Sequence, residues 1–264
     1  HLSLRRQRQM CIRDRLISVR NSHCHNRLHC SKAFEHPSEL LKDCARKMIK
    51  TWTTVLAVVV ASVTGAANAQ AVKGDAKAGE GKIAMCIGCH GITGYQASFP
   101  EVYKVPMIGG QNEAYIVSAL NAYKKGERKH PTMRGIADSL SEQDMADVAA
   151  FYAGHGKAKD GKAKEANPAV TALLQKGACF SCHGEGFSKP IDPSYPKVAG
   201  QYSDYVLRAL QSYKTDGNPL IGRSNGVMAG IAKQFKNDEL QQLAKYIGSL
   251  DSEMQVAVSY THLT

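Results

Sequence analysis

The sequence predicts an all-α protein made of two tandem copies of one small helical unit. Apolar residues recur at helical spacing in several segments, and no segment shows the alternation that is typical of a strand. The same segments also occur twice, in the same order, along the 264-residue chain. VPMIGGQNEAYIVSALNAYKKG (105–126) matches YPKVAGQYSDYVLRALQSYKTDG (195–217), TMRGIADSL (132–140) matches VMAGIAKQF (227–235), and DMADVAAFY (144–152) matches ELQQLAKYI (239–247).

Helices are expected in order along the first copy. The first runs from about Ala76 into Cys86. The second has a continuous apolar face and ends at Gly126, and the second copy repeats that face. Ser141, with Asp144 three residues later, resembles a capping box and starts the third. The apolar faces consist of Tyr115, Ile116, Ala119, Leu120 and Tyr123, then Tyr205, Val206, Ala209, Leu210 and Tyr213, and lastly Met145, Val148, Ala149 and Tyr152.

The formal charge of +11 at first suggests a nucleic-acid partner, but the charge is unevenly distributed. Residues 1–69 hold 12 Lys/Arg against 4 Asp/Glu, whereas the remaining residues hold 22 against 19. The part of the chain that carries the repeat is therefore close to neutral. We expect no nucleic-acid partner on this evidence.

Residues 48–69 have the layout of a secretory signal peptide. A basic start at Lys50 precedes an apolar run (55–63) and a small-residue ending (67–69). The run is too short to cross a bilayer, which takes about 20 residues. We expect cleavage after Ala69, so that the mature chain begins at Gln70, lies in the periplasm and keeps no integral membrane segment.

Residues 1–47 precede this signal peptide and are expected to be upstream sequence that is not translated. The opening SLRRQRQMCIRDR and the closing VSYTHLT (258–264) resemble translated sequencing-adaptor sequence. The expected organisation of the rest is a first domain, a Lys/Gly/Ala-rich linker, a second domain and a tail, at 70–153, 154–167, 168–250 and 251–264. Domains this small usually need disulfides, a metal or a large cofactor for stability.

Four of the eight cysteines follow Met48, and they form two C-x-x-C-H motifs, MCIGCHG (85–91) and CFSCHG (179–184). This motif is the signature of covalent haem attachment, in which the thiols bond to the porphyrin vinyl groups and the adjacent His reaches the iron. Two copies at matched positions predict two covalently bound haem c groups. Cys86, Cys89 and His90 would hold one, and Cys179, Cys182 and His183 the other.

Other uses of the cysteines explain less of the pattern. One zinc site would have to unite both halves of the duplication and would leave both histidines without a role. Thiol–disulfide exchange normally accompanies a βαβ pattern, which the sequence lacks. Two structural disulfides would not require a histidine after each pair.

Met133 and Met228 are the expected sixth ligands of the two irons. Each opens an M-x-G-I-A pattern just before the last helix of its copy, 43 and 45 residues after the motif histidine. His plus Met is the ligation of electron-transfer cytochromes c. The rival ligands are not repeated or lie on the wrong side of the binding helix; they are Met85, Met107, His130 and His155.

A P-x-x-x-G-Q segment follows each motif and suggests supporting roles. A carbonyl at or near Pro106 or Pro196 is the expected acceptor for the ring N–H of the motif histidine, although Pro also suits a simple loop. Gly110 and Gly200 would let the backbone approach the cofactor. The remaining residues are expected to start helices or to pack in the haem pocket: Gln111 and Gln201 in the first role, and Tyr115, Tyr123, Tyr205 and Tyr213 in the second.

With these residues, the chain resembles a dihaem cytochrome c of the c4 type. The resemblance covers about residues 73–250 and rests on both C-x-x-C-H motifs, both P-x-x-x-G-Q segments and the two methionines. It implies two class I cytochrome c domains, each wrapped round one covalently attached haem, with haems that communicate. The Lys-rich linker and the longer second methionine loop, TDGNPLIGRSNGVM, depart from the family's pattern.

The resemblance implies a periplasmic electron carrier that passes single electrons between respiratory redox proteins, often towards a terminal oxidase. A dihaem peroxidase-like enzyme is the rival from another class, and it would need one iron with an open or displaceable ligand. A cytochrome subunit of a dehydrogenase or oxidase complex is the third hypothesis. The basic stretch YKKGERKH (123–130) is either a docking patch for an acidic partner or a solvated helix end.

Overall fold

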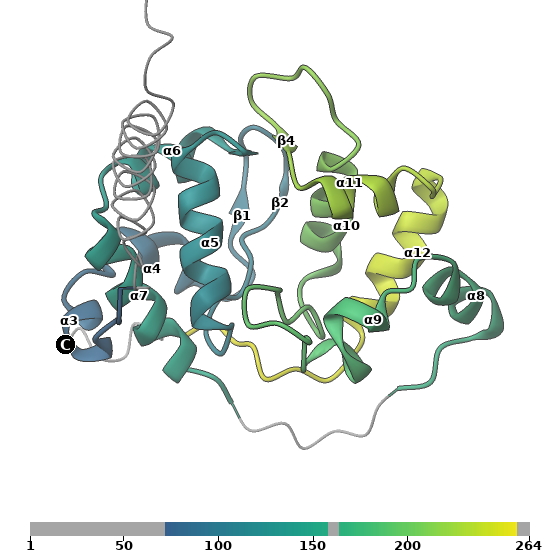
Figure 1. Ribbon diagram of the computed structural model, residues 1–264, viewed down its shortest axis with the longest axis horizontal. Helices are drawn as coiled ribbons and strands as arrows, with labels where there is room; N and C mark the ends of the chain where they lie inside the picture. Colours follow the sequence, from purple (N-terminus) through teal and green to yellow (C-terminus); the bar gives the residue numbers. More distant parts are fainter. Residues whose placement is uncertain (1–71, 158–163, 258–264) are drawn as a thin grey trace, which may run out of the picture. The chain divides into compact units, whose positions relative to one another are not determined.

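Helices dominate the residues that the computed structural model describes, which are 72–157 and 164–257 (Figure 1). The prediction of an all-α fold is confirmed. The expected upstream segment (1–47) and signal peptide (48–69) lie outside the described residues, as do the middle of the expected linker and the end of the tail.

The first repeat folds into α3 (Ala76–Glu80), α4 (Ala84–His90), α5 (Glu113–Lys124), α6 (Pro131–Asp138) and α7 (Glu142–Gly154). The predicted single helix from Ala76 to Cys86 is wrong, because the chain turns between α3 and α4. Gly79 lies so close to α7 that a Cβ would stand 2.2 Å from the Asp147 carbonyl oxygen. Gly81 then caps α3, with its N–H bonded to the Gly79 carbonyl.

The second repeat folds into α8 (Pro168–Lys176), α9 (Phe180–His183), the 3₁₀ turn η1 (Glu185–Phe187), α10 (Ser203–Ser212), α11 (Gly226–Ala232) and α12 (Asn237–Gly248). α8 and α10–α12 correspond to α3 and α5–α7 in order along the chain. The apolar faces predicted for α5 and α10 are present, and the buried residues on them are Ile116 and Leu120 in α5 and Val206 in α10.

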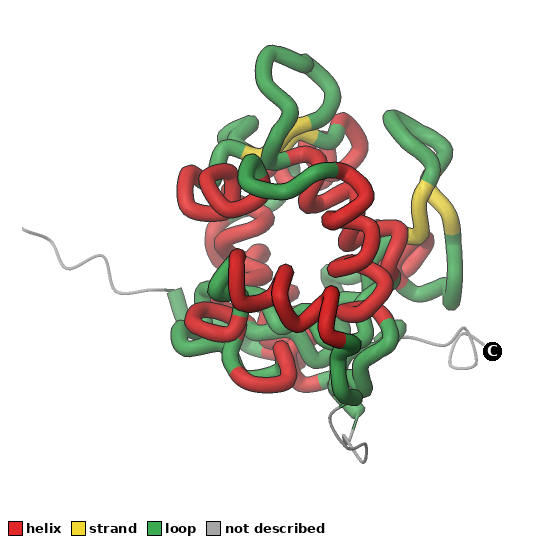
Figure 2. The backbone as a smooth tube through the Cα atoms, turned by 90° about the vertical axis from the view of Figure 1, so that its right-hand side faces the viewer, coloured by secondary structure: helices red, strands yellow, loops and turns green. Residues whose placement is uncertain are grey.

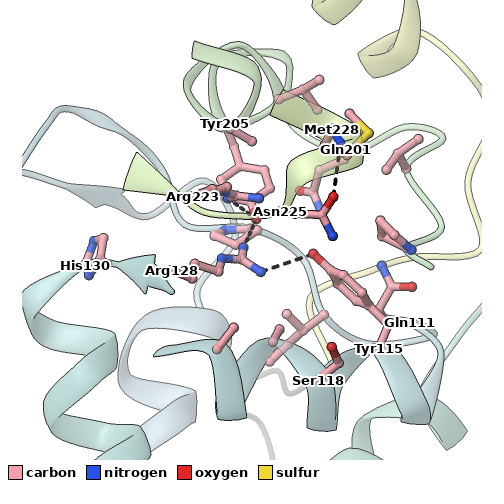
Figure 3. A pocket seen from close by; sticks show the side chains of 18 of the residues that line it. Gln111, Tyr115, Ser118, Arg128, His130, Gln201, Tyr205, Arg223, Asn225 and Met228 are labelled. Atoms are coloured by element: carbon pink, nitrogen blue, oxygen red, sulfur yellow. Dashed lines mark hydrogen bonds between the residues drawn. The ribbon is translucent and has the colours of Figure 1, made fainter. Parts of the chain in front are cut away.

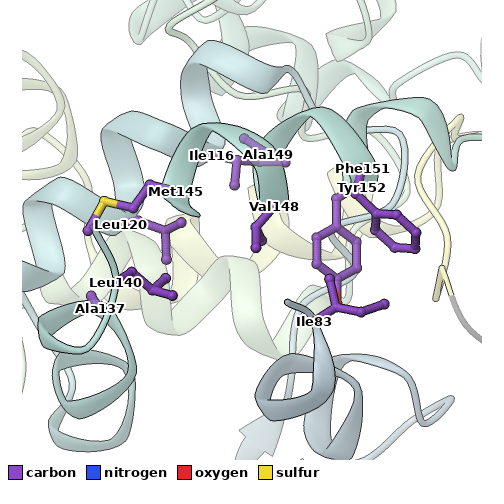
Figure 4. Packing of buried hydrophobic residues seen from close by; sticks show 10 residues of the cluster. All are labelled: Ile83, Ile116, Leu120, Ala137, Leu140, Met145, Val148, Ala149, Phe151 and Tyr152. Carbon is purple, nitrogen blue, oxygen red and sulfur yellow. The ribbon is translucent and has the colours of Figure 1, made fainter. Parts of the chain in front are cut away.

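Each repeat has its own apolar core. In the first, α7 packs against α3 and α5, and the predicted capping box of Ser141 and Asp144 starts α7. All four residues predicted for the inner face of α7 are buried there (Figure 4). In the second repeat, α12 packs against α10 and α8 around Leu174, Leu240 and Leu243.

A buried carboxylate fixes the start of the first repeat to α7. Asp147 is 2% exposed, and it accepts hydrogen bonds from the Asp75 backbone N–H (2.8 Å), the Gln143 amide (2.7 Å) and the Lys82 ammonium (2.6 Å). These donors hold the pKa of the Asp147 carboxyl below its usual range, with Lys82 the largest cause. The position matched in the second repeat is Gln242, so α8 is held there mainly by apolar packing.

Four strands of two residues each occur within the described residues, shown in yellow in Figure 2. β1 (Gln96–Ala97) pairs with β2 (Tyr103–Lys104), and β3 (Arg128–Lys129) pairs with β4 (Gly222–Arg223), both antiparallel. A two-residue strand is too short to show alternation, so the sequence could not reveal it. β3 and β4 come from different repeats and join them.

Two glutamines join the repeats by mirrored hydrogen bonds. The Gln111 side chain accepts from the Lys197 backbone N–H (2.9 Å) and donates to the Lys197 carbonyl (2.8 Å). The Gln201 side chain accepts from the Met107 N–H (3.1 Å) and donates to its carbonyl (2.9 Å). Met107 and Lys197 occupy matched positions, so the two repeats face each other with approximate two-fold symmetry. The expectation that these glutamines only start helices is therefore wrong.

The segment after α12 returns across this junction to the first repeat. Met254 is 1% exposed, and its sulfur accepts from the Gln111 amide at 3.4 Å and the Gln201 amide at 3.9 Å. Gln255 then forms a β-bridge with Gly109, and Ala257 packs against the first core. We call residues 251–257 the C-terminal strap; in Figure 1 it is the yellow chain that leaves α12.

The loop that contains β1 and β2 adds a contact without a counterpart in the second repeat. It lies against α10 of the other repeat. The Lys104 N–H donates to the Asp204 carboxylate (3.0 Å), and Glu101 pairs with Arg208 (3.3 Å). The contact between the repeats is therefore symmetric at the glutamines and asymmetric at this loop.

Candidate functional site

One continuous cavity of about 1060 Å³ contains all the residues that the sequence singles out for chemistry. It is lined by residues of both repeats, and Figure 3 shows part of it from close by. Pockets that hold one drug-sized ligand have volumes of roughly 300–1,000 Å³, so this cavity suits a large ligand or more than one. The predicted ligand residues on its wall are Cys86, Cys89, His90, Met133, Cys179, Cys182, His183 and Met228.

The cysteines reach the cavity from the two short helices that follow α3 and α8. Cys86 and Cys89 lie on α4, and Cys182 lies on α9, of which Cys179 is the N-cap residue. All four are free thiols. Burial raises the pKa of Cys86 and of Cys179. Within residues 72–157 and 164–257, no three cysteine, histidine or carboxylate side chains gather as a metal cluster, so the zinc alternative has no site there.

Each motif histidine is held by a hydrogen bond at the last turn of its helix. Nδ1 of His90 lies 2.8 Å from the Pro106 carbonyl oxygen, and Nδ1 of His183 lies 3.1 Å from that of Pro196. A carbonyl only accepts, so Nδ1 carries the proton and Nε2 keeps its lone pair for a metal. Burial lowers the pKa of both histidines, which favours the neutral ring. The prediction for the proline carbonyls is confirmed.

Met133 and Met228 occupy the same position in two short helices, α6 and α11, and both line the cavity. Each is the third residue of its helix, and its N–H bonds to the N-cap side chain. His130 Nδ1 accepts from Met133 at 3.3 Å, and Asn225 Oδ1 accepts from Met228 at 3.0 Å. His130 and Asn225 thus serve as matched caps.

The other rival ligands have different surroundings. His155 stacks on Phe151 and bonds to the Phe151 carbonyl oxygen at 2.6 Å. Met85 is 52% exposed, although it borders the cavity. Met107 also lines the cavity, and its backbone is bound by Gln201.

Gly110 and Gly200 of the P-x-x-x-G-Q segments approach the strap, and the expectation that they face the cofactor is wrong. Gly110 has a φ of +81°, and a Cβ there would stand 2.7 Å from the Glu253 carbonyl oxygen in the strap. Gly200 has a φ of +65°, and a Cβ would stand 2.4 Å from the Ser252 Cβ. Glycine is needed at both positions for the left-handed backbone and for the close passage of the strap.

Two arginines between the repeats were missed by the sequence analysis. Arg128 and Arg223 face each other across β3 and β4, and both line the cavity (Figure 3). The four predicted pocket tyrosines line the same cavity, and Tyr115 and Tyr205 accept hydrogen bonds from these guanidinium groups. Each arginine precedes its methionine by five residues, R-x-x-x-x-M in both copies. That repeated spacing is the signal that would have found them.

Several basic side chains of the stretch 123–130 contact other parts of the protein. Lys124 donates to the Leu140 carbonyl (2.6 Å), and Lys129 donates to the Asn218 carbonyl (2.7 Å). Arg128 faces the cavity. Lys124 and Lys125 remain exposed, so the stretch also presents positive charge at the surface.

The site fits covalently bound haem. Each half offers two free thiols, an imidazole with a fixed tautomer and a thioether, all on the wall of one large cavity. The Nε of Arg128 is buried there without a hydrogen-bond partner among the described residues. The donor set, the volume and this unsatisfied cation all match an apolar ring that carries acidic groups.

Comparison with known proteins agrees with this chemistry. The sequence profile of the cytochrome c family matches the chain twice, at residues 76–154 and 169–251. Cytochrome c4 of Stutzerimonas stutzeri is 30% identical over 208 residues, which cover 71% of this chain and 93% of that protein. The thiosulfate dehydrogenase electron acceptor of S. stutzeri strain A1501 is 27% identical over 210 residues, covering 72% and 92%.

A solved structure shows the same likeness. The crystal structure of reduced recombinant cytochrome c4 from Pseudomonas stutzeri superposes with a TM-score of 0.51 and 30% identity, and the match covers 67% of this chain and 99% of that chain. The chain belongs to the cytochrome c family and, within it, to the dihaem cytochromes of the c4 type, which are electron carriers with two covalently attached haem c groups.

Proposed function

We propose that the protein is a periplasmic carrier of single electrons between respiratory redox proteins, with one His/Met-ligated haem in each repeat. The observation that carries this proposal is the repetition of the whole ligand set at matched positions on one cavity wall. The thioether bonds would form at Cys86, Cys89, Cys179 and Cys182, and the axial ligands would be His90 with Met133 and His183 with Met228.

The haem supplies the electron-accepting iron, and the protein residues position it and set its potential. The proline carbonyls orient the two imidazoles and strengthen Nε2 as an electron-pair donor, since each carbonyl accepts a hydrogen bond from Nδ1–H. The N-caps His130 and Asn225 fix the start of the helices that carry the methionines. A methionine thioether as the second protein ligand would raise the potential of the haem, as suits electron transfer.

Export is supported by the signal-peptide layout of residues 48–69 and by the use of the cysteines. We propose a mature chain from Gln70, with domains at 70–153 and 168–250, a linker at 154–167 and a tail from 251. Among the described residues, none of the helices is long and apolar enough to span a bilayer. N-terminal sequencing of the exported protein tests this proposal, and a start other than Gln70 would contradict it.

Two kinds of partner are proposed for the carrier. A terminal oxidase is the first acceptor to test, because of the resemblance to the c4 type. The second candidate is a dehydrogenase that donates electrons, which the similarity to a thiosulfate dehydrogenase electron acceptor supports. Stopped-flow mixing of the reduced and oxidised protein with each class of enzyme distinguishes them, because only a true partner will exchange electrons rapidly and saturably.

The ligand assignment is tested by the far-red sulfur-to-iron charge-transfer band of the oxidised protein, measured against total haem. Two His/Met sites predict a band that accounts for both haems. Met133→Ala and Met228→Ala should each remove about half of it, lower one midpoint potential and let one ferrous iron bind carbon monoxide. Met85→Ala is the control, since Met85 is largely exposed. An unchanged band in either ligand variant would contradict that assignment.

A further inference from the structure

The helices that carry the two methionines begin directly after a pair of strands that the repeats share. β3 of the first repeat pairs with β4 of the second, and Lys129 lies opposite Gly222. His130, the residue after β3, is the N-cap of α6, and Asn225, two residues after β4, is the N-cap of α11. Each methionine is therefore separated from the shared strands by only three or four residues.

Further hydrogen bonds between the repeats flank this pair of strands. The Ser224 N–H donates to the Glu127 carbonyl at 2.8 Å, and the Lys129 ammonium donates to the Asn218 carbonyl at 2.7 Å. The lysine stem passes close to β4, since a Cβ at Gly222 would stand 3.7 Å from the Lys129 Cδ. Because two strands alone are marginally stable in water, a pair this short needs these neighbouring bonds to hold it.

The longer methionine loop of the second repeat supplies part of this contact. Between Tyr213 and Arg223 it has five residues more than its counterpart in the first repeat. Asn218 lies in this longer part, and its side chain accepts from two backbone N–H groups of the loop, at 2.8 and 3.2 Å. The loop, which joins α10 to β4 in Figure 1, is thereby folded so that the Asn218 carbonyl reaches Lys129. The feature of the second loop that departs from the c4 pattern therefore contacts the first repeat.

The position of each methionine depends on the residues next to these strands. The N–H of Met133 donates to His130 Nδ1 at 3.3 Å, and that of Met228 donates to Asn225 Oδ1 at 3.0 Å. α6 and α11 have only eight and seven residues, and helices this short are marginal without support from the rest of the protein. A displacement of β3 or β4 would therefore move a cap residue and, with it, a methionine.

We propose that β3 and β4 form a shared support for both axial methionines, with Lys129 and Ser224 as positioning residues. The proposal rests on the assignment of Met133 and Met228 as iron ligands. When one methionine leaves its iron, the start of its helix shifts, the strand pair is strained, and the start of the other methionine helix loosens. The two methionine–iron bonds are therefore coupled, and the coupling acts equally in both directions.

The test uses the dihaem protein and variants that weaken the strand pair from either repeat. Ser224→Pro removes the N–H that donates to Glu127, and Ser224→Ala, which keeps that N–H on an exposed residue, is its control. Lys129→Gln removes the ammonium bond to Asn218, and Lys125→Gln, at an exposed lysine of the same stretch, is its control. Lys129→Arg keeps a donor and should behave as the unaltered protein does. If Ser224→Pro does not retain two haems, Lys129→Gln carries the test.

Amide hydrogen exchange at Met133 and Met228, followed by ¹⁵N NMR of the reduced protein, reports the opening of each helix start, whichever side chains bind the irons. Lys129→Gln, in the first repeat, should speed exchange at Met228 by at least about fivefold. Ser224→Pro, in the second repeat, should do the same at Met133. Neither control should change either rate. A change confined to the repeat that carries the substitution would overturn the proposal.

Imidazole, which competes with methionine for ferric iron, then tests the coupling at the irons themselves. The bound methionines are followed through ¹³C-labelled methyl groups. Met133→Ala should let imidazole displace Met228 at least about fivefold more readily, and Lys129→Gln should abolish that difference. Equal displacement of Met228 with and without Met133 would refute the coupling. A far-red band that either methionine variant leaves unchanged would instead refute the ligand assignment, and the exchange rates alone would then decide whether the strands support both helices.

Discussion

The two repeats differ most where they start and least where they bind the cofactor. The first is anchored at its N-terminal end by the buried Asp147 with three donors, and the second by the apolar residues of α8. The histidine–proline bond, the N-capped methionine and the inward arginine are the same in both. The start of a repeat can therefore be anchored in several ways, whereas the residues on the cavity wall keep the same arrangement in both repeats.

The largest expected effect is the loss of one haem from one repeat. Replacing both Cys86 and Cys89 by Ala should lower the haem content from two to one per chain, because a haem without thioether bonds is not retained through denaturation. The matched change at Cys179 and Cys182 should do the same for the second repeat. The pyridine haemochrome absorbance per chain measures this. Ser181→Ala, in the second motif and exposed, is the control; two haems retained in either double variant would refute the attachment sites.

The next largest effect concerns the mirrored glutamines. Gln111→Ala and Gln201→Ala each leave one N–H and one carbonyl of a half-buried residue of the other repeat without a partner, so each should lower the free energy of unfolding by about 2–4 kcal/mol. Lys197 retains bonds to Gly110 and Glu253 when Gln111 is removed. Gln201→Ala should therefore be the more damaging of the two.

Denaturant unfolding with absorbance from both haems measures this difference. Gln234→Ala is the control, since Gln234 is exposed and its side chain donates to the carbonyl of the nearby Gly230 in α11. Equal and negligible effects at Gln111 and Gln201 would show that the contact between the repeats does not depend on these side chains.

The smallest expected effect is a difference in acid sensitivity. The folded pKa of Asp147 is lowered, so its contribution to stability is complete above its unfolded pKa of about 3.9 and is lost as pH falls towards the folded value. Asp147→Asn should lower stability near neutral pH and flatten its decline in acid. Gln242 holds the matched place, so the second repeat lacks this dependence.

Thermal unfolding between pH 3 and pH 7 checks this prediction. Asp192→Asn is a matched control, because Asp192 also has a lowered pKa but bonds only to the nearby Ser194 on the surface. A pH profile of Asp147→Asn that parallels the unaltered protein would contradict the role given to this carboxylate.

Repetition made the cofactor-facing half of the site predictable. The motifs, the methionines and the prolines occur twice in the sequence, so each candidate residue in one repeat could be compared with its counterpart in the other. The arginines are repeated too, but a charged residue in a basic stretch is usually solvated, and the spacing to Met133 and Met228 had to be noticed first. The break between α3 and α4 follows Gly79, which packs closely against α7, and no local pattern encodes that tertiary contact.

The contacts between the repeats were the least predictable. Gln111 and Gln201 bond to backbone atoms some ninety positions away in the chain, and backbone atoms carry no sequence signal. The strap was assigned to a tail because residues 251–257 lie beyond the repeat and have no periodicity. The sequence thus indicated what each half binds, while the way the halves meet required the structure.

The strap has a consequence for the order of events during biogenesis. Met254 and Gln255, which close the junction, are among the last described residues to be synthesised. If the chain folds during synthesis, the first repeat therefore folds before the C-terminal strap is available to join it to the second repeat.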